Sequence, residues 1–164
     1  MHRIIILVVG LLLFIDTSGQ ELCDITRISK QEQEILENFC VKLKNAVNSK
    51  DVKQLSSLCN FPLRHSFLVR TPKDDYQKFV KISRKKFEKT QHRLLLSEYL
   101  IEKLNKGNPI ELLSSQTDSS GVKCYYFFSY PINRSNNPLV SQQGYLQIEK
   151  IGEKYKIVSI WTIP

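Results

Sequence analysis

Apolar residues recur at three- and four-residue spacings between Ser29 and Asn48, and this periodicity predicts an amphipathic helix. Ser29, followed three residues later by Glu32, forms the capping-box pattern that begins such a helix. Asn48-Ser49 interrupts the pattern, and a second, short helix is predicted over 51–58. The two helices are therefore expected to form an antiparallel hairpin that turns near Ser49. The apolar stripe of the first helix consists of Ile35, Leu36, Phe39, Leu43, Ala46 and Val47.

The next segment changes from alternating to helical spacing. Pro62 ends the second helix, and the alternation over 63–70 predicts a half-buried strand. The early proline and acidic residues of 71–74 are typical of a helix start, so a third helix is predicted to run to about Leu96. Its inward side chains are expected to be Tyr76, Phe79, Val80, Ser83 and Phe87.

The remainder of the chain has the pattern of strands. The segment 110–115 is short, and 123–130 is rich in aromatic residues. Two further segments, 144–151 and 155–163, flank Gly152-Glu153 and predict a hairpin. Helices followed by hairpin-linked strands predict an α+β fold, with N-terminal helices packed on a curved antiparallel sheet whose concave face forms a pocket.

The first residues have the organisation of a secretory signal peptide. Met1-His2-Arg3 is basic, an apolar run follows, and Thr17-Ser18-Gly19 is small and polar. The apolar run is shorter than the roughly 20 residues that span a bilayer. We expect 1–19 to be removed, 20–28 to form an N-terminal arm and 29–164 to form a single domain, in a secreted or periplasmic protein. Asn133 begins a glycosylation sequon, which matters only in a eukaryotic host.

Four cysteines follow the predicted signal peptide, and an even number in an oxidising compartment indicates disulfides rather than catalytic thiols. Cys40 lies nine residues before the turn near Ser49 and Cys59 lies ten after it. A Cys40–Cys59 bridge across the helical hairpin is therefore geometrically natural, and elimination pairs Cys23 with Cys124. Sequence alone leaves all three connectivities open.

Three segments resemble the nuclear transport factor 2-like superfamily, which includes ketosteroid isomerase and scytalone dehydratase. They are Cys59-Asn60-Phe61-Pro62-Leu63 after the helical hairpin, the acidic and aromatic run 73–79, and the closing hairpin 144–150 with 155–160. The resemblance implies a cone-shaped α+β fold with a pocket, and it allows a homodimer through the sheet. It implies no activity, because the superfamily includes enzymes, ligand binders and assembly modules. No catalytic residue of its enzymes matches a position here.

The formal net charge of +8 raises the question of an anionic partner. A secretory address argues against nucleic acid and leaves an anionic surface outside the cytoplasm. The predicted third helix would carry such a partner on one basic face, although a run of charges on a helix is usually its solvated side. This basic face consists of Lys81, Lys85, Lys89 and Arg93.

Candidate chemistry is sparse. His65 shares the apolar face of its predicted strand and is the one candidate for acid–base catalysis, although a core histidine is the simpler interpretation. The chain has no metal-ligand spacing and no nucleotide-binding loop, so no metal and no cofactor are expected. The residues expected to line the pocket are His65, Tyr126, Phe128, Tyr145 and Trp161.

These patterns favour a non-enzymatic binding module. It would hold a small apolar ligand in the cone or a protein partner on the sheet. Two alternatives remain: a small enzyme that uses His65 for proton transfer in the pocket, and a protein that binds an anionic surface through the basic face.

Overall fold

The computed structural model describes most of the predicted domain. The described residues are 23–70, 75–118, 120, 123–132 and 143–163. The predicted signal peptide, 1–19, and the sequon at Asn133 lie outside them.

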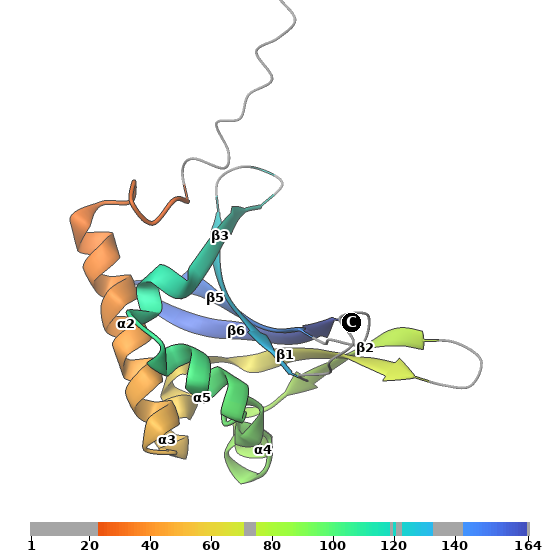
Figure 1. Ribbon diagram of the computed structural model, residues 1–164. Helices are drawn as coiled ribbons and strands as arrows, with labels where there is room; N and C mark the ends of the chain where they lie inside the picture. The colour runs from red at the N-terminus through yellow and green to blue at the C-terminus, as the bar shows by residue number, and fades with distance from the viewer. Residues whose placement is uncertain (1–22, 71–74, 119, 121–122, 133–142, 164) are drawn as a thin grey trace, which may run out of the picture.

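Two helices open the described chain as the sequence predicts. Helix α2 spans Lys30–Asn48, and the Ser29 side chain accepts a hydrogen bond from the backbone N–H of Glu32. Helix α3 spans Val52–Leu58 and is capped in the same way by Asp51. The hairpin positions the buried face of α2 against the sheet (Figure 1).

The predicted third helix is wrong over its first half. Residues Asp75–Ile82 form strand β2, which pairs antiparallel with β1, Cys59–Arg70. The local pattern fits either structure, and the backbone of β1 supplies the hydrogen bonds that select the strand. Ser83 then caps a short helix α4, Arg84–Lys89. The remaining helical elements are η2, Gln91–Leu95; α5, Glu98–Asn105; and η3, Pro109–Leu112.

Six strands form one curved sheet in the order β2-β1-β6-β5-β4-β3 (Figure 1). The last four strands are β3, Leu113–Thr117; β4, Cys124–Pro131; β5, Gln143–Ile151; and β6, Lys154–Ile163. All pairs are antiparallel except β1 with β6, which is parallel. The predicted α+β fold is therefore confirmed, with one difference. The sheet is mixed because the first hairpin joins it beside the last strand.

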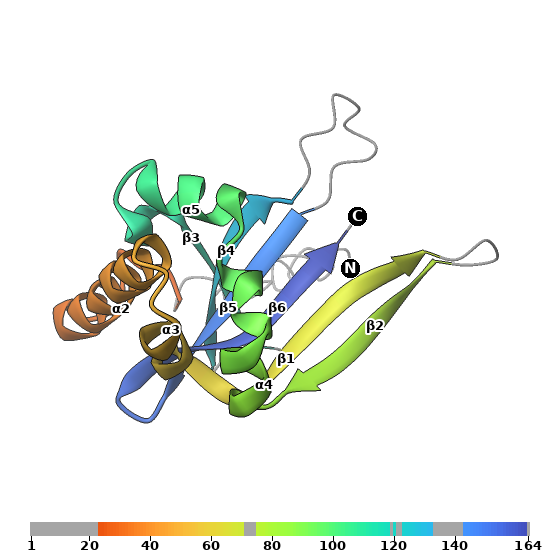
Figure 2. The same cartoon turned by 90° about the horizontal axis from the view of Figure 1, so that it is seen from below.

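The described helices pack on one face of the sheet, and the β1–β2 hairpin extends beyond them (Figures 1 and 2). We call this face the helix-covered face. Its strand residues pack with Leu36 and Leu43 of α2 in one core. The core residues of the central strands are Tyr126, Phe128, Leu146, Ile148 and Ile160, each at most 1% exposed. Because side chains alternate along a strand, the residues between them point to the opposite face, which we call the open face.

Candidate functional site

A groove of about 530 Å³ lies on the open face, across β2, β1, β6 and β5. The strand register builds it in rows, because residues paired across neighbouring strands point the same way. The cation row runs Lys81, Arg64, Ser159, Gln147. The aromatic row, two residues farther along each strand, runs Phe79, Ser66, Trp161, Tyr145.

The aromatic row exposes apolar surface. Phe79 is 77% exposed, and Ile163, which lies two residues beyond Trp161 on β6, is 40% exposed. The Trp161 ring packs edge-to-face with the Phe127 ring, at 5.6 Å between centroids, and lies 6.3 Å from the Tyr145 ring. Isolated exposed apolar residues are ordinary, but apolar side chains that converge on one concave surface are typical of interaction sites.

The exposed lining of the groove is largely apolar, whereas its buried floor contains polar side chains that are hydrogen-bonded. Ser66, Gln147 and Ser159 are all buried. The Gln77 side-chain amide donates to Ser66 Oγ and, at 3.0 Å, to the backbone carbonyl of Thr162. No buried side-chain polar atom in the described part of the chain lacks a hydrogen-bond partner. The floor is therefore a stable surface rather than a defect in the packing.

Positive charge lies at one end of the groove. Arg64 and Lys81 are direct partners across β1 and β2, and both are exposed. The nearest described acid is Glu149, whose side chain is 6% exposed. It accepts hydrogen bonds from Arg64 at 3.4 Å, from the Gln147 amide at 2.9 Å and from Lys123. The bond with Glu149 also raises the pKa of Lys123 above its ordinary value.

His65 borders this groove from the other side of the sheet. It pairs with Val80 and Ile160, its ring lies 5.1 Å from the Phe67 ring, and partial burial lowers its pKa. Among the residues whose side chains are described, no carboxylate forms an ion pair with it.

The expected pocket-lining residues are divided between the two faces. Trp161 lines the open-face groove, Tyr145 packs beside Trp161, and His65 borders the groove from the other side of the sheet. Tyr126 and Phe128 are buried in the core of the helix-covered face. Sequence reasoning missed Phe79 and Gln77 as groove residues because it assigned 75–82 to a helix. The alternation of Gln77, Phe79 and Lys81 along that segment is the signal that identifies them.

A second cleft of about 320 Å³ is lined by residues near the N-terminal end of α2, by β4 and by the β5–β6 hairpin. The Glu32 carboxylate accepts hydrogen bonds from the Tyr155 hydroxyl and from Lys150. Burial opposes ionisation of Glu32, but these two bonds outweigh it and hold its pKa below the usual range. Burial and the bond to Glu32 raise the pKa of Tyr155. Both carboxylate oxygens are occupied, so this cluster ties α2 to the sheet.

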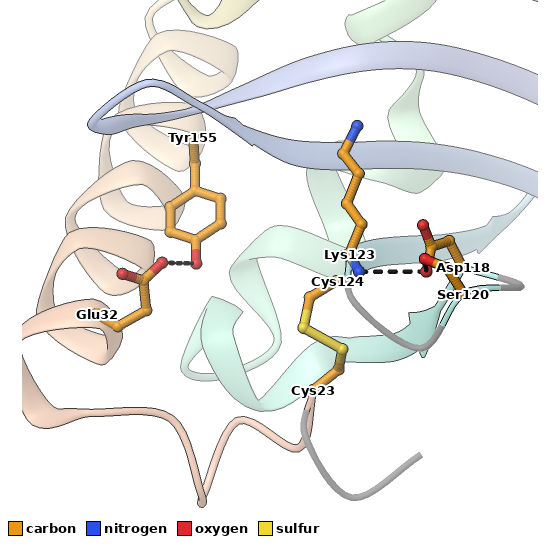
Figure 3. The surroundings of a disulfide bond; sticks show 7 residues. All are labelled: Cys23, Glu32, Asp118, Ser120, Lys123, Cys124 and Tyr155. Carbon is orange, nitrogen blue, oxygen red and sulfur yellow. Dashed lines mark hydrogen bonds between the residues drawn. A yellow bond between two sulfur atoms is a disulfide. The ribbon is translucent and has the colours of Figure 1, made fainter. Parts of the chain in front are cut away.

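The cysteines confirm one of the two predicted bridges. Cys23 and Cys124 form a disulfide beside this second cleft (Figure 3). Cys40 and Cys59 are buried free thiols, so the predicted Cys40–Cys59 bridge is wrong. Helix α3 ends at Leu58, and Cys59 has the extended backbone that begins β1. The chain therefore turns into the sheet, whereas Cys40 lies about two turns farther back along α2.

The predicted basic face does not lie on one helix. Lys81 belongs to β2, Lys85 and Lys89 to α4, and Arg93 to η2. Residues four apart share a face only on a continuous helix. No such helix forms here, because the segment that contains Lys81 pairs with β1 as a strand. Lys81 instead joins the cation row.

The described residues contain no cluster of three or more His, Cys, Asp or Glu side chains arranged to hold a metal ion. Within the same residues, no helix combines the length and apolar character needed to cross a membrane.

No family model and no curated protein matches the chain. Among solved structures, it is similar to an NTF2-like protein of unknown function from Pseudomonas putida, with 5% identity, 82% of this chain and 87% of that chain covered, and a TM-score of 0.44. A protein of unknown function with a cystatin-like fold from Nostoc punctiforme has 12% identity over 84% and 95% of the two chains, at a TM-score of 0.46. A designed protein with a curved β-sheet has 11% identity, with 83% of this chain and 100% of that chain covered, and a TM-score of 0.41.

These likenesses concern the fold alone and carry nothing about function. Several of the similar structures are described as NTF2-like.

Proposed function

We propose that this protein is a secreted or periplasmic, non-enzymatic binding module that takes a small apolar ligand in the open-face groove. The observation that carries the proposal is the 77% exposure of Phe79 in the same groove as Trp161 and Ile163. An apolar side chain left in water at the edge of a concave surface loses nothing when a ligand covers it and gains burial of both surfaces. The groove volume of about 530 Å³ lies within the range of roughly 300–1,000 Å³ that holds small ligands.

The proposal places the ligand on the open face rather than inside the cone. The aromatic side chains that were expected to line the cone, Tyr126 and Phe128, are at most 1% exposed and fill the space between helices and sheet. The Cys23–Cys124 disulfide supports the proposed compartment, because such bonds persist in oxidising environments.

Native mass spectrometry of the protein purified from its own host, without refolding, tests the proposal. We expect an additional mass that is lost on denaturation and is absent from the variant Phe79→Ser. Val41→Ser is the matched control, since Val41 is 45% exposed on α2, away from the groove. A bare monomer for the wild type, or retention of the extra mass in Phe79→Ser, contradicts the proposed site. A bare dimer that Phe79→Ser dissociates would assign the same face to an interface between copies of the chain.

A further inference from the structure

Arg64 and Lys81 stand directly opposite each other on an antiparallel strand pair, an arrangement that is unfavourable for two like charges. The Arg64 side chain is 60% exposed, and its one described ionic partner, Glu149, is shared with Lys123. Lys81 forms no ion pair with a described residue. Within the described part of the groove, the accessible charge is therefore positive.

The charged end continues directly into the apolar part of the groove. Ser66 and Trp161 lie two residues beyond Arg64 and Ser159 on the parallel strands β1 and β6, a step of about 7 Å. Ile163 lies another two residues along β6 and is also part of the groove lining. The groove thus has a cationic end and an apolar length of about 13 Å from the cation row to Ile163.

We infer that the groove selects an anionic single-chain amphiphile, with its carboxylate between Arg64 and Lys81 and its chain over Trp161 toward Ile163. This inference rests on the proposed function and specifies its ligand. The guanidinium group of Arg64 presents paired donors that match a carboxylate, and the Lys81 ammonium adds a second charge-assisted bond. The anion also relieves the repulsion between the two cations.

A small amphiphile satisfies this groove better than a second copy of the chain. A symmetric dimer across the open face would bring two cation rows into one interface, where like charges in contact are costly. A small ligand meets the charge at one end and the apolar surface along the rest, without bringing further cations.

Trp161 is the single tryptophan of the chain, so its fluorescence reports on the groove directly. We would titrate the protein at pH 7 with decanoate and decyltrimethylammonium below their critical micelle concentrations, and with 1-decanol below its solubility limit. Decanoate is expected to bind roughly tenfold more tightly than 1-decanol, the equivalent of one net charge-assisted hydrogen bond. Decyltrimethylammonium is expected to bind more weakly than either.

Two variants assign the preference to the cation row. Lys81→Gln and the double variant Arg64→Gln with Lys81→Gln should lower decanoate affinity toward that of 1-decanol and leave 1-decanol unchanged. The double variant Lys85→Gln with Lys89→Gln removes the same charge from α4 and should keep the full preference. Lys81→Gln leaves the bond between Arg64 and Glu149 intact, so it tests the inference even if the double variant folds poorly.

The outcomes separate the two proposals. Equal affinities for decanoate and 1-decanol in the wild type overturn the anionic head and leave the apolar site standing. A preference that survives Lys81→Gln and the double variant also overturns the assignment to this end of the groove. Failure of all three probes to change Trp161 emission overturns both proposals and leaves a protein partner as the occupant of the open face.

Discussion

The two faces of the sheet use the same strands for opposite purposes. On the helix-covered face, Phe128, Leu146 and Ile160 are paired across β4, β5 and β6 and are at most 1% exposed. On the open face, the next row along these strands places Gln147 beside Ser159, and Phe79 of β2 is left largely in water. Burial on the first face stabilises the fold. The second face retains apolar surface that the fold itself does not use.

Alanine substitutions of two neighbouring residues of β4 test the difference between the two faces most directly. Phe128→Ala should lower the free energy of unfolding by about 3–5 kcal/mol, because it leaves a cavity in a fully buried core. Phe127→Ala should cost at least about 1 kcal/mol less, because Phe127, although only 6% exposed, points to the open face, where Trp161 and water can move into the vacated space.

Urea unfolding followed by circular dichroism gives both values. Equal losses would show that the open face is a second core, and the contrast between the faces would fail.

The disulfide secures the N-terminal arm at one end of the helix-covered face. Replacing Cys23 and Cys124 together by Ser should cost about 2–5 kcal/mol, because the bond closes a loop with a sequence separation of 101 residues. Ligand binding in the open-face groove should be retained, since neither cysteine is among the groove-lining residues. A variant that stays folded but loses the Trp161 response would show that the two faces are coupled.

The two free thiols in the core should make the stability of the protein depend on pH. Burial raises the pKa of Cys40 and of Cys59 to about 12, from an ordinary value near 9. The thiols stay neutral in the folded protein while those of the unfolded chain ionise, so their contribution to stability is complete below pH 9. It should fall by about 1 kcal/mol per thiol between pH 9 and pH 10, and continue to fall toward pH 12.

Unfolding midpoints measured across that pH interval test this expectation. The variant Cys40→Ala with Cys59→Ala should lose stability less steeply as pH rises. Identical slopes for the variant and the wild type would mean that the thiols are accessible in the folded state. Native thiol labelling would then also be fast.

The smallest effect on stability is expected on the open face itself. Phe79→Ser should change the free energy of unfolding by no more than about 0.5 kcal/mol, because the ring is already 77% exposed. The same change should abolish ligand binding in the groove. A loss of several kcal/mol in thermal unfolding would instead make Phe79 part of the core.

The sequence by itself determined the parts that depend on local signals. The Ser29 cap and the apolar stripe of α2 gave that helix correctly, and Gly152 allows the tight turn of the β5–β6 hairpin with a φ of 61°. The sequence left the disulfide connectivity open, and the elimination that favours Cys23–Cys124 depends on a Cys40–Cys59 bridge that does not form. Helices before hairpins were enough for the α+β class.

Only the tertiary structure decided what depends on partners distant in the sequence. Asp75–Ile82 is a strand because β1 supplies its hydrogen bonds, and this pairing moves Lys81 from a helix to a position opposite Arg64. The groove follows from the parallel pairing of β1 with β6, which places Ser66 beside Trp161. Local periodicity indicates that side chains alternate between two faces. It does not indicate which face the helices cover, because that choice is made by the total burial of the core.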